Sequence, residues 1–319
     1  MFRIFIPACL LFLFGCSQMN TEEEKSSPKH IVFVTGDEEY RSEESMPMLA
    51  QVLTRDGYRV SICYSLDSLG YIDPNNINHI SGLEVLDSAD LMVLFTRFRA
   101  LPESEAKHIL NFAESGKPMV GFRTATHAFR YPDSTKWSHL NDEWPINVFG
   151  QKWITHHGHF SDGDHFLTEV SLDSTSSTHP ILNGVAPFKA YSWLYHVRGG
   201  QDSLYGDSAP LLWGKALRSN HANAKRLDQF PIDNVVAWTK TYTGSAGIPA
   251  RVFFTTLGHP YDFKEESMRK LALNGIRWAL AKEDEIPTDG SNADFVTPYQ
   301  PNNSGFGKKF KPNRKPPTI

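Results

Sequence analysis

Short runs of apolar residues alternate along the chain with longer stretches in which apolar positions recur every three or four residues. The clearest runs are residues 31–34 (IVFV), 91–95 (LMVLF) and 119–122 (MVGF), and such continuous runs are typical of strands buried on both faces of a parallel sheet. Residues 43–55 and 265–282 carry apolar side chains at helical spacing. The pattern therefore predicts an alternating α/β protein.

The remaining elements follow the same pattern. Further strands are expected at residues 58–64, 234–238 and 251–256, and a helix is expected from Pro102 to about Ser115. Between residues 130 and 231 the alternation is lost, and this stretch is rich in Trp, His, Gly and Pro. We expect it to be a Trp/His-rich insertion with short strands on the ligand side of the sheet.

The N-terminus has the pattern of a bacterial lipoprotein signal. Arg3 precedes an apolar stretch at residues 4–14, and Gly15 and Cys16 follow it. The stretch is too short for a bilayer, which needs about 20 residues, and the alternative is an ordinary signal peptide that ends near an unrelated cysteine. The predicted organisation is a signal peptide at 1–15, a flexible tether at 16–28 that begins with lipidated Cys16, a domain at 29–285 and a Pro/Asn/Lys-rich C-terminal tail at 286–319. We expect this tail to be solvated and to pack loosely on the domain, and the alternative is a basic contact with a membrane or polymer.

Composition narrows the class of protein further. With 319 residues, 40% of them apolar, the chain can bury a large core. A net charge of -4 gives no field that attracts nucleic acid, so none is expected as a partner. If Cys9 leaves with the signal and Cys16 carries lipid, Cys63 has no partner for a disulfide. Seven Trp residues favour a ligand with a flat face, such as a carbohydrate.

Charged side chains and imidazoles follow four of the predicted strands. In an open parallel sheet, ligands bind beyond the carboxyl ends of the strands. Each residue alone has a structural explanation, such as an ion pair or a helix cap, but the convergence of the set predicts a ligand crevice. The strand-end residues are Asp37, Glu38, Glu39 and Arg41, then Arg97 and Arg99, then Arg123 and His127, and finally His259.

The insertion adds a second candidate cluster. If residues 153–159 form a strand, the two-residue period places Trp153, His157 and His159 on one face, and we expect both imidazoles to face the same cavity. A His-x-His pair on a strand is a common half-site for a metal. The sequence shows no third ligand at motif spacing, so no cofactor is expected to be required, and a divalent metal at His157 and His159 is the alternative.

The familiar catalytic motifs are absent from the sequence: there is no Gly-x-Ser-x-Gly elbow, no Gly-x-Gly-x-x-Gly after a strand, no Walker loop and no His-Glu-x-x-His. Several segments nevertheless resemble the trehalose-utilisation (ThuA-like) family, especially its exported bacterial branch. These segments are residues 35–44 (TGDEEYRSEE), 95–99 (FTRFR), 121–129 (GFRTATHAF), 156–159 (HHGH), 237–242 (AWTKTY) and 258–259 (GH).

The resemblance covers about residues 29–285 and implies the fold of the class I glutamine amidotransferase superfamily. That fold is a flavodoxin-like parallel sheet flanked by helices. In an amidotransferase a nucleophilic Cys follows the strand that here ends at Phe122, and this chain has Arg123 instead. An Arg is always protonated and does not attack a carbonyl, so glutamine hydrolysis at this position is excluded.

The family's association with sugar utilisation implies a small carbohydrate as ligand. We therefore expect an exported lipoprotein that Cys16 anchors to the cell envelope, at the outer membrane because Ser17 follows the Cys, where it faces the periplasm or the cell surface. The expected reaction is hydrolysis, elimination or isomerisation of a sugar or keto-sugar, and the alternative is non-catalytic carbohydrate binding. The predicted acid–base residues are His127, His157, His159, His259 and Glu39. The predicted substrate-binding residues are Asp37, Arg41, Arg97, Arg99, Arg123 and Trp153.

Overall fold

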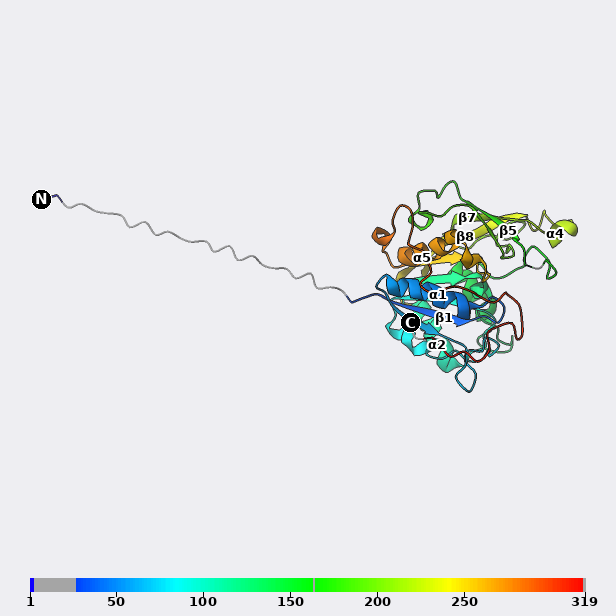
Figure 1. The fold of residues 1–319 in the computed structure, drawn as a ribbon, viewed down its shortest axis with the longest axis horizontal. Coiled ribbons are helices and arrows are strands. Elements are labelled where there is room, and N and C mark those ends of the chain that lie inside the picture. The colour runs from blue at the N-terminus through cyan, green and yellow to red at the C-terminus, as the bar shows by residue number, and fades with distance from the viewer. Residues whose placement is uncertain (3–26, 163, 318–319) are drawn as a thin grey trace.

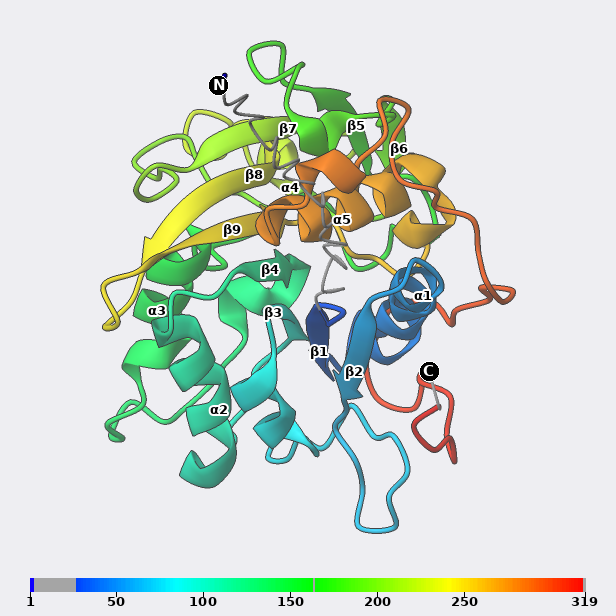
Figure 2. The same cartoon turned by 90° about the vertical axis from the view of Figure 1, so that its left-hand side faces the viewer.

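A single nine-stranded sheet forms the centre of the computed structural model, which describes residues 1–2, 27–162 and 164–317 (Figures 1 and 2). The strands are β1 (His30–Gly36), β2 (Arg59–Cys63), β3 (Leu91–Thr96), β4 (Met119–Phe122), β5 (Thr168–Leu172), β6 (Phe188–Ala190), β7 (Ala209–Ala216), β8 (Asp233–Thr243) and β9 (Pro249–Thr255). The α-helices are α1 (Ser42–Arg55), α2 (Glu103–Glu114), α3 (His139–Phe149), α4 (Asn220–Asn223) and α5 (Glu266–Ala279).

The strand order is β2-β1-β3-β4-β9-β8-β7-β5-β6. The first five of these strands are parallel, and their order is that of a flavodoxin-like sheet. The other four extend the sheet with antiparallel pairs. The predicted flavodoxin-like fold is therefore confirmed, and the sheet is mixed because antiparallel strands extend its parallel half. The short connection between β8 and β9 explains the change, because parallel neighbours need a long crossover.

Helices cover both faces of the sheet (Figure 2). Side chains of α1 and α5 belong to one buried cluster, and those of α2 and α3 belong to the other. Along β1, Ile31 and Phe33 enter the first cluster while Val32 and Val34 enter the second. Burial on both faces therefore accounts for the continuous apolar sequence of this strand.

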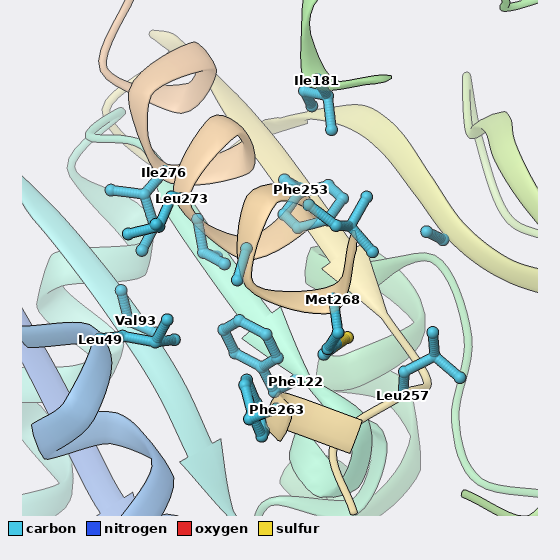
Figure 3. Close-up of a cluster of buried hydrophobic side chains, with 14 of the residues drawn as sticks. Leu49, Val93, Phe122, Ile181, Phe253, Leu257, Phe263, Met268, Leu273 and Ile276 are labelled. Carbon is cyan, nitrogen blue, oxygen red and sulfur yellow. The ribbon is translucent and has the colours of Figure 1, made fainter. Parts of the chain in front are cut away.

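Helix α5 packs closely on β9 and β4. Its Met268, Leu273 and Ile276 lie in the buried cluster that also holds Phe253 and Phe122 (Figure 3). Gly275 permits this approach, because a Cβ atom at that position would lie 2.3 Å from the Phe253 ring. The predicted helix at residues 265–282 is thus confirmed, with slightly shorter ends.

The predicted insertion contains more regular structure than expected. Besides β5, β6 and β7 it includes α3, whose Trp144 and Phe149 are buried against Phe129 and Phe254. Pro145 lies inside this helix, and the apolar residues of α3 do not follow a single helical stripe. The sequence pattern therefore gave no clear helical signal there.

The C-terminal tail runs along the domain. Tyr299 is half-buried, with its hydroxyl donating to the carbonyl oxygen of Pro260 at 2.9 Å, and the amide of Ile72 donates to the carbonyl oxygen of Arg314 at 2.8 Å. Lys311 pairs with Glu44 of α1. These contacts hold the tail against the domain, while most of its residues remain partly or fully exposed.

The predicted signal peptide and most of the tether, including Cys16, lie outside the described residues. Within the described part of the chain, no helix has both the length and the apolar character needed to cross a membrane.

Candidate functional site

A cavity of about 540 Å³ opens at the carboxyl ends of β1, β3 and β4. The strand order reverses between β1 and β3, and such a switch point is where ligands bind in open α/β sheets. The insertion and the C-terminal tail complete the walls. The residues that line the cavity are Glu39, Tyr40, Arg97, Phe98, His127, Trp153, Thr155, His156, Gly158, His159, Phe160, Trp193, Tyr195, Asn220 and Phe306.

Asp37 shapes the loop that carries Glu39 into this cavity. Its Oδ1 atom accepts hydrogen bonds from the amides of Glu39 (2.7 Å) and Tyr40 (2.8 Å), and Oδ2 accepts one from the Thr124 hydroxyl. Asp37 is fully buried. The structure thus places Asp37 behind the loop, where it positions Glu39 and not a ligand.

Arginines and glutamates form an ion-pair network beside Glu39. Arg97 Nε lies 3.2 Å from Glu39 Oε2, and Arg97 also pairs with Glu38. Arg99 is fully buried and donates to Glu38 Oε2 at 2.5 Å and to the carbonyl oxygen of Pro74 at 3.0 Å. Of the two arginines predicted to bind substrate here, Arg97 lines the cavity, whereas Arg99 is held behind it.

Glu39 has an unusual acid–base environment for a carboxyl group. Burial raises the pKa of Glu39 to about 7, although the positive charge of Arg97 opposes the shift. A carboxyl with a pKa near neutrality can hold or release a proton at physiological pH. Glu39 is therefore placed to donate a proton to a group in the cavity.

Arg123 occupies the sharp turn after β4 with a left-handed backbone (φ 40°). Its guanidinium lies between the rings of Tyr40 and Tyr195, at 4.1 and 4.4 Å from their centroids, and Nη1 donates to the carbonyl oxygen of Thr256 at 2.8 Å. It is 0% exposed and does not line the cavity. Contrary to expectation, Arg123 is therefore not placed to contact a ligand directly. It instead supports Tyr40 and Tyr195, which do line the cavity.

Arg41 is also buried away from the cavity. It has a left-handed backbone (φ 55°), and its Nη2 donates to the carbonyl oxygens of Glu38 and Gly305, the latter at 2.6 Å. These hydrogen bonds connect the loop between β1 and α1 to the C-terminal tail. Arg41 is therefore placed to organise this loop and not to bind substrate.

His127 faces the cavity inside a cage of aromatic rings. Its ring centroid lies 4.9 Å from that of Phe98, 5.6 Å from Trp153 and 6.3 Å from Tyr195. Burial, with the nearby charges of Arg97 and Arg123, lowers the pKa of His127 well below its ordinary value of 6.5. The ring is therefore neutral at pH 7.

Hydrogen bonds assign the tautomer of His127. The Thr126 hydroxyl donates to the carbonyl oxygen of Arg123 at 3.1 Å, so it accepts from Nδ1–H of His127, 3.0 Å away. This assignment leaves Nε2 with a free lone pair. His127 can accordingly accept a proton from a group in the cavity.

Residues 151–160 do not form the strand that the His-x-His spacing predicted. His156 makes an isolated bridge with Tyr195, and Gly158 then has a left-handed backbone (φ 103°), which ends the two-residue alternation. As a result His156 and His159 line the cavity, while His157 is 1% exposed and lies outside it. The prediction that His157 and His159 face one cavity is wrong.

The three imidazoles of this loop have different environments. His156 stacks on Trp193 with centroids 4.6 Å apart, and burial lowers its pKa to about 4. His157 hydrogen-bonds through Nδ1 to Ser219 Oγ at 2.7 Å, and burial lowers its pKa to about 4 as well. His159 Nε2 accepts from the Asn223 side chain at 3.2 Å. Among the described residues, no three His, Cys, Asp or Glu side chains come together in a way that could hold a metal ion.

His259 lies near the cavity but behind Tyr40. The two ring centroids are 6.3 Å apart, and the ring of His259 also stacks on Tyr191. Its Nδ1 accepts from the amide of Tyr261 at 3.1 Å, so Nε2–H donates to Ser304 Oγ at 2.9 Å. Burial and the Arg123 charge lower its pKa to about 3. Arg123, His127 and His259 therefore lie close together at one edge of the sheet, as expected, because Arg123 contacts both Tyr40 and Tyr195, His259 lies against Tyr40, and His127 lies near Tyr195. Of the three, only His127 lines the cavity.

Trp153 lies where its predicted role requires, lining the cavity with 39% of its surface exposed. Several lining residues were not among the predicted site residues. Tyr40 and Phe98 sit within the strand-end segments and could have been included from their position alone. Phe306 has a weaker signal, an aromatic residue between two glycines in a polar tail.

The chain is similar to solved structures of ThuA-like proteins. One from Parabacteroides merdae ATCC 43184 is 17% identical with a TM-score of 0.48, and the match covers 90% of this chain and 100% of that chain. Another, from Bacteroides uniformis ATCC 8492, is 17% identical with a TM-score of 0.46, and the match covers 80% of this chain and 92% of that chain. No curated protein matches this chain.

A family model agrees with the resemblance of the sequence motifs. The ThuA model, described as trehalose utilisation, matches residues 30–279. This range includes the parallel half of the sheet, the insertion and all the lining residues of the cavity except Phe306. The chain therefore belongs to the ThuA family, which is associated with trehalose utilisation.

Proposed function

We propose that this protein binds a small carbohydrate in the cavity and acts on it by acid–base chemistry, as a hydrolase, lyase or isomerase of a sugar or keto-sugar. The observation that carries the proposal is the pairing of two groups in one cavity. Glu39 has a pKa of about 7, while His127 is neutral with a free Nε2 lone pair. Environments that shift the pKa values of two titratable groups in opposite directions are typical of an acid and its partner base.

In this proposal His127 Nε2 accepts a proton and Glu39 donates one. For hydrolysis, His127 would take the proton of an attacking water and Glu39 would protonate the departing oxygen. For elimination or isomerisation, His127 would take a proton from carbon next to a carbonyl, and Glu39 would protonate an oxygen. The aromatic lining supports binding of the apolar face of a sugar ring. His157 and His259 would act only through the residues they support, because they lie behind the cavity.

A second candidate function is carbohydrate binding without turnover. The specific observation in its favour is that seven of the lining residues are Tyr, Phe or Trp, while Arg97 is engaged by Glu38 and Glu39. A cavity of this kind could hold a sugar by stacking and release it unchanged.

We further propose that the mature protein is a lipoprotein of the cell envelope, anchored through Cys16 to the outer membrane. The support for this proposal is the sequence of the predicted signal peptide and the cysteine that follows it.

Turnover and binding of trehalose, maltose and their keto derivatives by the full-length protein would test the catalytic proposal. We expect conversion by the wild type and a loss of about 10² to 10⁴ in rate for Glu39→Gln and for His127→Gln. The measurement is repeated with a chelator, because a chelator-sensitive rate would indicate a metal. Binding without conversion would favour the second candidate, and the absence of both would rule out these sugars as ligands.

A further inference from the structure

Phe306 is an aromatic side chain of the C-terminal tail that lines the cavity beside Glu39 and Arg97. It leaves 48% of its surface exposed, in a segment otherwise rich in Pro, Asn, Gly and Lys. Single exposed apolar residues are common on protein surfaces. The contacts that hold Phe306 at the cavity distinguish it from such residues.

Three hydrogen bonds fix the segment that carries Phe306. The amide of Gly305 donates to the carbonyl oxygen of Glu39 at 2.8 Å, and Arg41 Nη2 donates to the carbonyl oxygen of Gly305 at 2.6 Å. Ser304 Oγ is bonded to His259 Nε2 at 2.9 Å. We call residues 303–307 the C-terminal strap. Its anchors are the residues that immediately follow β1 and β9, so the strap is bound to the carboxyl ends of the sheet.

Glycines on both sides of Phe306 shape the strap. Gly305 and Gly307 have left-handed backbones (φ 129° and 72°), which other residues adopt at a cost. The sequence Ser-Gly-Phe-Gly therefore allows a tight path that presents one large ring to the cavity.

The ring of Phe306 also covers the ion pair of the site. The guanidinium of Arg97 lies between two aromatic rings, 4.4 Å from the centroid of Phe98 and 5.0 Å from that of Phe306. Arg97 is the ion-pair partner of Glu39. Phe306 is thus in contact with the charged wall of the cavity and not with solvent alone.

Every other described residue that lines the cavity falls within residues 30–279, the part matched by the ThuA family model. We propose that Phe306 contacts the bound carbohydrate, so that the C-terminal strap is part of the binding site. This inference rests on the proposed function, because it takes a sugar as the occupant.

The test compares wild type, Phe306→Ala, Phe306→Trp and Phe295→Ala in the full-length protein. Phe295 is a matched control, since it belongs to the same tail, is 38% exposed and does not line the cavity. Calorimetric titration with trehalose, maltose and their keto derivatives should show about three- to tenfold weaker binding for Phe306→Ala, the range of one lost aromatic contact. Phe306→Trp and Phe295→Ala should bind within about twofold of wild type, and all four melting temperatures should agree closely.

A second measurement does not depend on the sugar. Two tryptophans, Trp153 and Trp193, line the cavity with Phe306. Acrylamide quenching of tryptophan fluorescence should increase in Phe306→Ala, and the increase should be lost when Trp153→Phe and Trp193→Phe are both added. Sugar binding by wild type with equal affinity in Phe306→Ala would overturn the role of Phe306 and leave the proposed function intact. No sugar binding together with increased quenching would overturn the carbohydrate function and retain Phe306 as a cavity wall, while no binding and unchanged quenching would overturn both.

Discussion

Glu39 and Glu43 lie four residues apart in the sequence and are both buried, but they differ in their position relative to the cavity. Burial raises the pKa of each to about 7. Only Glu39 lines the cavity at the carboxyl ends of the strands, whereas Glu43 lies in α1. Comparing the two residues therefore distinguishes the energetic cost of burying a carboxylate, which both share, from a role in catalysis, which is proposed for Glu39 alone.

The first prediction uses this pair to relate stability to pH. The native state keeps the proton of Glu39 up to about pH 7, while the unfolded chain releases it near pH 4.5. The native state thus binds more protons between these values, and the free energy of unfolding falls as pH rises through this window. Glu39→Gln and Glu43→Gln should each gain melting temperature relative to wild type as pH rises from 4.5 to 7.

The same two variants should differ in activity. Glu39→Gln should lose turnover at every pH, while Glu43→Gln should retain it. In the wild type, kcat/KM should fall tenfold per pH unit above about pH 7, because Glu39 then lacks the proton it donates. A pH–rate profile with no decline above pH 7 would show that Glu39 is not the proton donor.

The imidazoles of the His156–His159 segment give a second prediction. His159→Gln should weaken sugar binding or turnover with little change in melting temperature, because His159 lines the cavity and is exposed. His157→Gln should lower the melting temperature, because the side chain is buried and bonded to Ser219. Thermal melts and binding measurements on both variants would check this, and equal losses of binding at unchanged stability would contradict it.

At the scale of elements, the sequence correctly predicted the strands and helices in which the spacing of apolar residues matches the burial of their side chains. The strands at residues 31–34, 91–95 and 119–122 are confirmed, because burial on both faces leaves an unmistakable apolar run. The strand considered for residues 153–159 does not form. A left-handed glycine at Gly158 breaks the two-residue period, and His156 pairs with Tyr195 only through an isolated bridge.

Packing of α5 on β9 supplies a third prediction. Gly275→Ala would normally favour a helix by about 1 kcal/mol, but here the added methyl group meets the ring of Phe253. Overpacking of this kind costs about 1–3 kcal/mol, so the variant should unfold at lower denaturant concentration. Adding Phe253→Leu makes room for the methyl group, and the double variant should be more stable than Gly275→Ala alone. Chemical denaturation of both variants measures the difference.

At the scale of the whole molecule, the sequence predicted the correct edge of the sheet for the cavity. It did not predict which residues line the cavity and which lie behind it. Strand ends locate Glu39, Arg97 and His127 because parallel strands converge at one edge. They do not reveal which side chains turn inward. Arg123 and His259 follow strands in the same way yet lie behind tyrosines. Phe306 comes from a tail whose path depends on long-range contacts that no local pattern encodes.

The final prediction concerns attachment to the membrane. The leader places a Gly15–Cys16 pair after an apolar stretch of eleven residues, at positions 4–14, which is typical of a lipid-modified cysteine. Among the described residues, no helix could hold the protein in a bilayer instead. We therefore expect Cys16→Ser to move the protein from the membrane fraction to the soluble fraction, with the cavity unchanged. Fractionation in high salt, which removes proteins held by charge alone, makes the measurement specific, with Cys63→Ser as the control that should remain membrane-bound. If Cys16→Ser stays with the membrane in high salt, the attachment does not depend on lipid at this cysteine.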